Sequence, residues 1–384
     1  MGPLTGIKVI ELGGIGPGPY AGQLLADMGA EVISVTRPGA GLIPGADEAG
    51  INERGKKSLV LNLRKPGASQ IILDLINTAD VLIEGNRPGV TERLGVGPKD
   101  CHAVNPKLVY GRMTGWGQTG PWASMAGHDI NYISITGALH AMGKDGTPPP
   151  IPINFVGDYG GGSLFLTNGI LAALLQAERT GKGDVVDAAI IDGVSSMAQI
   201  LYGMHAKKFW QPKRGANMLD GGAPFYRCYT AKDGEFMAIG CIEPQFFALM
   251  LELLEIKPED YGHQLNIGDW PRQNKLLEDV FASKTRDDWT HIFDGSDACV
   301  TPVLTYLEAA EHKQNKARGG LRAQDGLIHP RTAPVFETRG LEDPAFDLPA
   351  KGSDNHNILS GIGMSEAQIE SLIDDGVVSG PKTA

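Results

Sequence analysis

Short apolar runs alternate with helical patterns through the first half of the chain, and this alternation most constrains the fold. The pattern predicts helices over residues 21–28 and 66–79. It predicts buried strands over 7–12, 31–37, 58–63, 81–86, 107–113 and 184–192. Strands that alternate with helices form a parallel sheet covered on both faces, so we expect a Rossmann-like α/β unit.

The second half of the chain has a different pattern. An Asp-Gly turn between FYRCYTA and EFMAIG predicts a β-hairpin, and helices are predicted over 244–256, 273–283 and 285–294. This pattern indicates a smaller α+β domain. We therefore expect four parts: a first part of the large domain over 1–204, a connector over 205–224, the small domain over 225–314, and a return to the large domain over 315–384. The APVFET segment at 333–338 is expected to add to an existing sheet.

Charge and cysteine usage exclude several classes of function. The net charge of −11 disfavours general binding to nucleic acid or to an anionic membrane. The four cysteines are scattered, and we find no signal peptide and no apolar run of spanning length, so we expect a cytoplasmic protein without membrane insertion. His and Cys residues do not cluster at ligand spacing, so no metal site is predicted.

Basic residues recur around the ends of the predicted strands. In open α/β sheets, ligands bind beyond the carboxyl ends of the strands, so cations there are placed to meet an anion. CoA, with its phosphate groups, suits such a set. The alternative is that each is an ordinary solvated charge. The set comprises Arg37, Arg54, Lys56, Lys57, Arg64, Arg87 and Arg93.

The glycine-rich loop at 13–22 joins a strand to a helix, where dinucleotide-binding folds hold a pyrophosphate. Its spacing does not match that fingerprint, because Pro19 stands at the third glycine position. A tight turn with close backbone approach is the favoured interpretation.

Two polar residues in glycine-flanked segments are candidate acid–base groups. His128 can titrate near neutral pH, or it can be a structural histidine bonded to the backbone. Asp158 precedes three glycines and a long helix, where it can act as base or nucleophile while nearby N–H groups receive an oxyanion. A simple N-cap role would explain Asp158 but not the glycines. Glu243 precedes Pro244 at a predicted helix start, where a helix-start acid is the default interpretation.

Several segments that follow one another between residues 11 and 304 resemble the family III CoA-transferases and, within them, the α-methylacyl-CoA racemases. AGHDINY and GDYGGGS are the most specific of these segments. The full set is ELGGIGPGPYAGQLLADMGAEVISVTRPG, DVLIEGNRPGVTERLGVGP, YGRMTGWGQTGP, AGHDINY, GDYGGGS, GKGDVVDAAIIDG, RGANMLDGGAPFY and SDACVTPVL.

The resemblance implies a large Rossmann-like domain built from both chain ends, a small domain between them, and two interlocked subunits. It implies that His128 and Asp158 are the catalytic bases and that Asn154 and Glu243 support them. The positions implied to contact CoA are Arg37, Leu61, Asn62, Leu63, Arg64, Gly85, Asn86, Arg87, Arg93, Gly127, His128, Asp129, Ile130, Asn131 and Tyr132.

The reaction implied is the interconversion of (2R)- and (2S)-2-methylacyl-CoA without a cofactor, by two bases on opposite faces of the α-carbon. His128 is assigned to the (2S) face and Asp158 to the (2R) face. In transferase members of the family, the residue matching Asp158 is a nucleophile. A CoA-transferase therefore stays open as the alternative.

Overall fold

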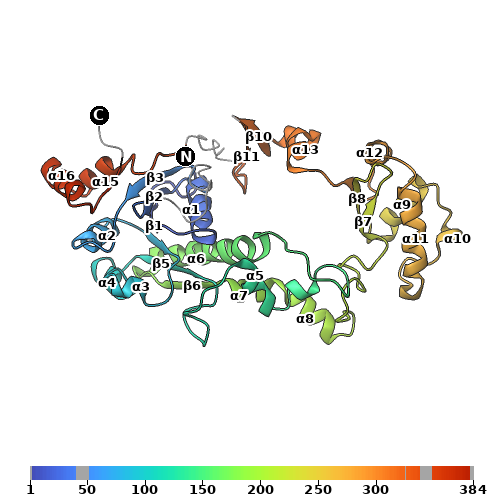
Figure 1. The fold of residues 1–384 in the computed structure, drawn as a ribbon, viewed down its shortest axis with the longest axis horizontal. Helices are drawn as coiled ribbons and strands as arrows, with labels where there is room; N and C mark the ends of the chain where they lie inside the picture. The colour runs from blue at the N-terminus through green and yellow to red at the C-terminus, as the bar shows by residue number, and fades with distance from the viewer. Residues whose placement is uncertain (1, 40–51, 325, 338–347, 381–384) are drawn as a thin grey trace. The chain divides into compact units, whose positions relative to one another are not determined.

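The computed structural model describes residues 2–39, 52–324, 326–337 and 348–380. The chain folds into two compact units, coloured along the sequence in Figure 1. We name them the sheet unit, formed by residues 1–136, 152–197 and 330–384, and the hairpin unit, formed by 137–151 and 198–329.

The sheet unit is built on a six-stranded parallel sheet with the order β3-β2-β1-β4-β5-β6. This is the strand order of doubly wound dinucleotide-binding folds. The prediction of a parallel α/β fold is therefore confirmed. The strands are β1 (Lys8–Leu12), β2 (Glu31–Thr36), β3 (Lys56–Val60), β4 (Val81–Glu84), β5 (Val109–Thr114) and β6 (Val185–Ala189).

Helices cover both faces of this sheet because successive strand side chains point to opposite sides. On one face, Ile10, Leu82 and Tyr110 pack with α2 (Ala68–Ile76) and the C-terminal helices in one buried cluster. On the other face lie α1 (Pro17–Asp27) and α6 (Leu164–Thr180). A Cβ atom at Gly111 would lie only 3.0 Å from Leu166, so this glycine lets α6 approach β5.

The C-terminal segment closes the open edge of the sheet at β3. The Ser58 N–H donates to Asp354 Oδ2 at 2.9 Å, and the Val60 N–H donates to Asn355 Oδ1 at 2.9 Å. Helices α15 (Asn355–Gly361) and α16 (Glu366–Asp374) then pack into the core, and Leu61 pairs with Val378 in an isolated bridge. The N–H groups that an edge strand leaves unpaired are satisfied in this way by residues far along the chain.

A π-helical turn, η2 (Phe155–Ser163), runs directly into α6. We expected no apolar run of spanning length, but Phe155–Thr180 is long and apolar enough to cross a membrane by length and composition alone. The most apolar 18-residue stretch of this segment is 44% buried inside the protein. The segment packs on the parallel sheet, and a core helix of a soluble protein passes the same test of length and composition.

The hairpin unit contains the predicted β-hairpin, in which β7 (Tyr226–Thr230) pairs antiparallel with β8 (Phe236–Gly240). β9 (Val300–Pro302) adds to β8. Buried aromatic residues, among them Phe225, Tyr229 and Phe281, form the core between the hairpin and its helices. The helices of this unit are α8 (Gln199–Ala206), α9 (Pro244–Leu253), α10 (Pro258–Tyr261), α11 (Trp270–Phe281), α12 (Arg286–Phe293), α13 (Tyr306–Glu311) and α14 (Lys313–Arg318).

Some predicted elements have different limits in the structure. Helix α1 begins at Pro17 rather than at residue 21, because Pro17 and Pro19 supply helical φ angles and need no donor in the first turn. The strand predicted over 184–192 ends at Ala189, where α7 (Ile190–Met197) begins. Residues 333–337 carry no strand, so APVFET does not join a sheet within its described part. A separate pair, β10 (Leu321–Gln324) and β11 (Leu327–Pro330), precedes it.

Candidate active site

Asp158 lies where the strand order of the sheet reverses, which is where doubly wound folds bind ligands. The reversal falls between β1 and β4, and the loop after β1 leads through Gly16 into α1. Gly16 has φ 73°, and a Cβ atom built on it would lie 3.0 Å from Asp158 Oδ2. The tight turn expected for this loop is therefore confirmed, and the loop backbone lies against the Asp158 carboxylate.

The glycines after Asp158 allow η2 to pack closely on its neighbours. A Cβ atom on Gly161 would lie 2.5 Å from Val194 in α7, and one on Gly193 would lie 1.9 Å from the Gly161 carbonyl oxygen. A Cβ atom on Gly162 would lie 3.1 Å from Pro17. The glycine run thus has a packing role that brings the Asp158 turn against α1 and α7. π-Helical turns inside longer helices are frequent at functional sites.

The surroundings of Asp158 raise its pKa to about 6. Burial is the largest cause, and the charge of Asp129 adds to it. A side-chain hydrogen bond with Asn154 and the nearby His128 act in the opposite direction. A carboxyl group with such a pKa can take and return protons near neutral pH, which suits a general acid–base residue.

His128 is brought into electrostatic reach of Asp158 by α5 (Asp129–Ile135). It is the N-cap of this helix, and its backbone N–H donates to Asn131 Oδ1 at 3.0 Å. Its carbonyl oxygen accepts from the Asn131 N–H at 2.8 Å. The imidazole itself is exposed. The structure thus brings together His128, Asp158 and Asn154, three of the residues proposed from sequence.

Asp129, next to His128, binds the backbone of the Asp158 turn. Its Oδ2 atom accepts the Asp158 N–H at 2.7 Å, and the Gly157 N–H also bonds to this carboxylate. The Tyr159 N–H donates to the Asn154 carbonyl oxygen at 3.2 Å. Our expectation that N–H groups close to Asp158 receive an oxyanion is therefore wrong for these amides, because they already have partners within the protein.

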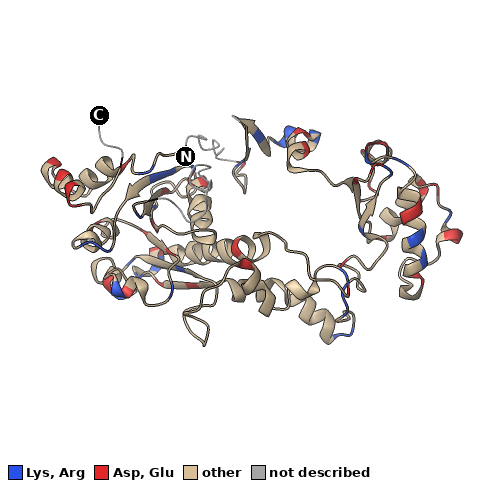
Figure 2. Ribbon diagram, viewed as in Figure 1, with Lys and Arg blue, Asp and Glu red and all other residues tan. Residues whose placement is uncertain are grey.

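The arginines expected to contact CoA are exposed and follow the carboxyl ends of parallel strands. Arg37 follows β2, Arg64 follows β3 and Arg87 follows β4, while Arg93 ends the short α3 (Val90–Arg93). Because the strands are parallel, these ends lie at one edge of the sheet. Figure 2 shows acidic and basic residues side by side around α3 and α4 (Pro98–Val104). Individual arginines, and not a broad positive surface, would therefore attract phosphate there.

The remaining expected CoA contacts differ in exposure. Asn62 and Leu63 are half-buried, whereas Leu61 is 1% exposed and offers a ligand little beyond its backbone. Gly85 is exposed, and the N–H of its neighbour Asn86 donates to Glu84 Oε2 at 2.7 Å.

A partly buried ion-pair network that we did not predict holds the loop after β4. Glu84 Oε1 accepts from Arg112 Nε at 3.1 Å, and Arg112 also pairs with Glu92 in α3 at 2.6 Å. The network supports the Gly85–Arg87 segment through the bond from Glu84 to the Asn86 N–H. The available signal was Arg112 within an otherwise apolar buried strand, since such a residue needs a partner.

Three basic residues expected at the anion-binding edge lie elsewhere. Arg54 is buried and pairs with Asp27 at 2.6 Å, and Lys56 is buried and pairs with Glu11 at 2.8 Å. Arg54 stands just before β3 and Lys56 is its first residue, so both lie at the amino end of the strand. Lys57 is also at that end and pairs with Glu31 at 3.0 Å. These three residues are therefore withdrawn from the set that could bind CoA.

Tyr132 fixes the segment from Gly127 to α5. Its hydroxyl donates to the Gly127 carbonyl oxygen, and its ring packs edge-on against Trp116 at 4.7 Å. Burial, with the charge of Asp158, raises the pKa of Tyr132 to about 12, while Arg87 acts in the opposite direction. Tyr132 is therefore a neutral group beside the Asp158 carboxylate at physiological pH. Ile130 and Asn131 of the same segment are exposed.

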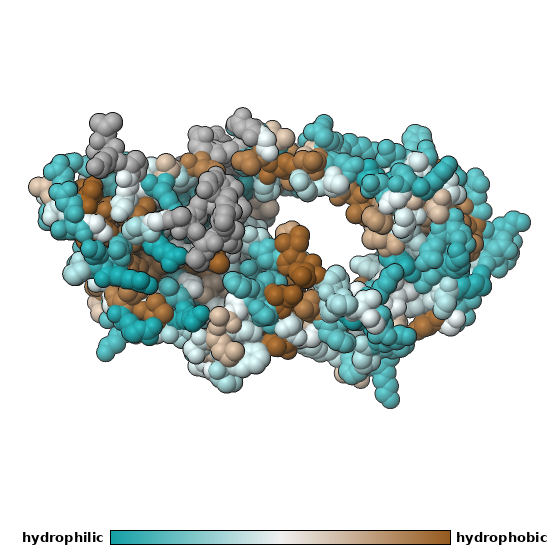
Figure 3. All heavy atoms as spheres, viewed as in Figure 1, coloured by the Kyte–Doolittle hydropathy of each residue, from teal (hydrophilic) through white to brown (hydrophobic). Residues whose placement is uncertain are grey.

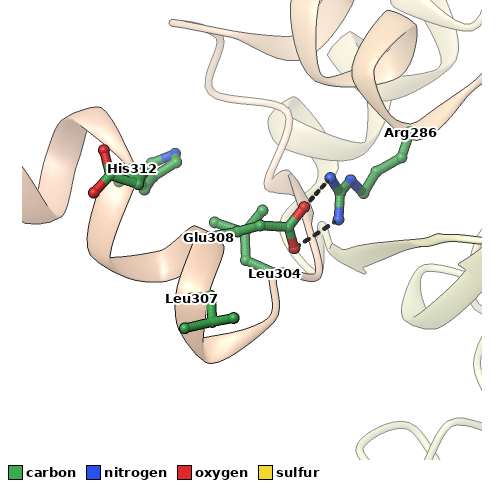
Figure 4. Close-up of a pocket in the computed structure, with 6 residues that line it drawn as sticks. Arg286, Leu304, Leu307, Glu308 and His312 are labelled. Atoms are coloured by element: carbon green, nitrogen blue, oxygen red, sulfur yellow. Dashed lines mark hydrogen bonds and ion pairs between the residues drawn. The ribbon is translucent and has the colours of Figure 1, made fainter. Parts of the chain in front are cut away.

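Glu243 belongs to the hairpin unit, where it follows β8 and is the N-cap of α9. Its side chain is exposed and makes no capping bond. Another part of this unit forms a shallow hollow around Arg286, Glu308 and His312, drawn in Figure 4. There the Arg286 guanidinium pairs with both oxygens of Glu308, at 3.2 and 2.6 Å. Among the described residues, no group of three or more His, Cys, Asp or Glu side chains could hold a metal ion.

Residues 4–355 match the family model described as CoA-transferase family III, and the chain belongs to this family. The chain is 42% identical over 384 residues to the alpha-methylacyl-CoA racemase of Homo sapiens, covering 99% of this chain and 98% of that protein. It is also 42% identical to the alpha-methylacyl-CoA racemase of Mus musculus, with the same coverage. The structure resembles that of a CAIB/BAIF family protein from Brucella suis, with a TM-score of 0.80, 27% identity, and coverage of 94% of this chain and 99% of that one.

Proposed function

We propose that this protein is a racemase that interconverts (2R)- and (2S)-2-methylacyl-CoA thioesters by moving one proton at the α-carbon. The observation that carries the proposal is the acid–base pair at the switch point, where Asp158 has a pKa of about 6 beside His128. The names of the human and mouse relatives, which are similar to the chain over nearly its whole length, support the same reaction.

The two bases act in turn on opposite faces of the α-carbon. Neutral His128 removes the proton of the (2S) isomer, and protonated Asp158 then returns a proton to the other face of the enolate. In the reverse direction, ionised Asp158 removes the proton of the (2R) isomer and the imidazolium of His128 returns one. The pair carries one transferable proton in either direction, and the pKa of about 6 lets Asp158 both take and return a proton near neutral pH.

The developing enolate needs a favourable electrostatic field. The helical segment Phe155–Thr180 starts at this site, and the positive end of its dipole favours negative charge there. The amides of Gly157 and Asp158 are bonded to Asp129, so we assign the stabilisation to this field and not to those amides.

We assign the CoA group to the exposed arginines at the carboxyl edge of the sheet, Arg37, Arg64, Arg87 and Arg93, because guanidinium groups bind phosphate well. The acyl chain then meets apolar surface near Asp158. Phe155 is 62% exposed and Met197 is 43% exposed, and a Cβ atom on Gly160 would lie 3.4 Å from Met197. Figure 3 shows hydrophobic residues on the surface next to α5 and α7.

We further propose that the enzyme is an interlocked homodimer, in which Glu243 of the partner subunit orients His128. Glu243 is exposed at the start of α9 and its side chain makes no capping bond, which leaves its carboxylate available for such a contact. The reaction needs no cofactor in this scheme. That expectation, like the cytoplasmic location, stays a prediction.

A CoA-transferase is the second candidate, because the family includes that reaction by name and Asp158 is a carboxylate that can act as nucleophile. In that reaction, Asp158 attacks the thioester carbon, CoA leaves as the thiolate, and an acyl anhydride forms. Such a mechanism requires Asp158 but not an acid–base group at His128.

The deciding experiment follows pure protein with (2S)-2-methylacyl-CoA in heavy water and no free carboxylate. Deuterium incorporation and the ratio of epimers are measured together, and we expect both exchange and epimerisation. The His128→Ala variant should lose epimerisation from (2S) by a factor on the order of 100 or more. A protein that shows no exchange, but transfers CoA once a free carboxylate is added, would move the assignment to the transferase.

A further inference from the structure

We propose that Asp129 is a positioning residue, whose carboxylate ties the turn that carries Asp158 to α5, the helix whose N-cap is His128. It thereby fixes the two bases relative to each other. This inference rests on the proposed function of His128 and Asp158 as a pair of bases, and it gives Asp129 a role different from the CoA contact implied by the family resemblance.

The contacts of Asp129 are specific for a carboxylate in this position. Its Oδ2 atom accepts the Asp158 N–H at 2.7 Å, and the Gly157 N–H bonds to the same group. A Cβ atom on Gly157 would lie 2.3 Å from Asp129 Oδ2, so only glycine allows this approach. The carboxylate thus caps the backbone of a turn 29 residues further along the chain.

Asp129 is also rigidly connected to His128. It is the first residue of α5, directly after His128, and Tyr132 holds the same helix through Gly127 and Trp116. Asp129 is 8% exposed, so its carboxylate has little freedom to move. A change in its bonds to Gly157 and Asp158 therefore alters the distance between the helix start and the Asp158 turn.

The charge of Asp129 gives it a second effect on the pair. Its Oδ1 atom is buried and has no hydrogen-bond partner among the described residues. Burial raises the pKa of Asp129, and the two amide bonds act in the opposite direction. Within the described part of the chain, Asp158 interacts electrostatically with His128, Asp129 and Tyr132, and of these Asp129 adds to the rise in the pKa of Asp158. A neutral residue that still accepts the amide bonds would separate the positioning effect from the charge effect.

Two substitutions test the two effects. Asp129→Asn keeps an oxygen that can accept the amide N–H groups but removes the charge, so kcat should stay within about tenfold of the wild type. The pH below which the rate from the (2R) isomer falls, which we call the acid limb, should move below pH 6. Asp129→Ala removes both effects, and kcat for epimerisation should fall about 100-fold with KM for the acyl-CoA changed by less than about threefold. Ser134→Ala, an exposed position on the same helix, is the matched control.

The readout is the heavy-water assay started separately from each isomer and repeated across pH. Loss of kcat in Asp129→Ala, with substantial recovery in Asp129→Asn and a lowered acid limb, supports the inference. An unchanged kcat in a folded Asp129→Ala protein overturns it. If that variant does not fold, an Asp129→Asn protein whose acid limb stays at the wild-type pH overturns it instead. A wild-type protein without exchange or epimerisation overturns both the proposed function and this inference. An active wild-type protein whose Asp129 variants have the same kcat and pH dependence overturns the inference alone.

Discussion

Asp158 combines a chemical role with an unfavourable setting for its own charge. In the proposed reaction it must be ionised to take the proton of the (2R) isomer. Because its pKa is about 6, kcat/KM for that isomer should fall tenfold per pH unit as the pH decreases below about 6. Initial rates from pH 4.5 to 8 check this, and a limb at the ordinary aspartate value near 4 would contradict it.

The raised pKa also has a consequence for stability. The folded state binds the Asp158 proton more tightly than the unfolded state, so this residue lowers stability as the pH rises from about 4 to about 6, and the loss is complete above that pH. Asp158→Asn should therefore be inactive but more stable, by about 1 kcal/mol at pH 8, a value reduced because the side chain is partly exposed. Urea unfolding at pH 8 and pH 4 checks this, since the gain should disappear at the lower pH.

The candidate residues could be identified from the sequence by their charge and type, but their burial could not be predicted. His128, Asn154 and Asp158 come together as expected, because two glycine-flanked segments converge on the switch point. Lys56 looked equivalent to Arg64, yet it is buried against Glu11, a partner 45 positions away in sequence. The resemblance implies a CoA contact for Asp129, whereas its bond to the Asp158 amide depends on a turn that no local pattern reveals.

At the scale of elements, the packing of η2 on α7 should not tolerate a methyl group. Gly193→Ala would place a Cβ atom 1.9 Å from the Gly161 carbonyl oxygen, and backbone cannot move aside as a flexible side chain can. We expect a loss of about 3 kcal/mol in the free energy of unfolding. Gly203→Ala in α8 is the control, because a Cβ atom there meets nothing within 4 Å, and it should be neutral or slightly stabilising. Equal unfolding midpoints for the two variants would refute the argument.

The elements with strong periodicity were predicted and those defined by tertiary contacts were not. The alternation of apolar runs located β1, β2 and β4 to within a few residues. The π-helical turn was not predicted, because no local pattern marks it and its close contacts, such as that of Gly161 with Val194, are tertiary. Helices α15 and α16 were not predicted either, because for the tail over 315–384 we expected only a return to the large domain.

At the scale of the whole molecule, both ends of the chain are needed to complete the sheet unit. Asn355 accepts the Val60 N–H and donates to the Ser379 carbonyl oxygen at 3.0 Å, so it joins the edge strand to the last residues of the unit. Asn355→Ala should lower the free energy of unfolding by about 2 kcal/mol. His356→Ala is the control, because the exposed pair of His356 with Glu366 should contribute less than about 1 kcal/mol. Thermal unfolding of both variants measures the difference.

The late position of these edge residues affects how the protein is made. A ribosome releases β3 almost 300 residues before it releases Asp354 and Asn355, which cover the outer edge of that strand. Throughout that interval the nascent sheet presents bare N–H groups and the apolar surface that α15 and α16 later cover. The growing chain therefore carries an uncovered strand edge until these residues emerge, and the sheet unit cannot complete its fold before then.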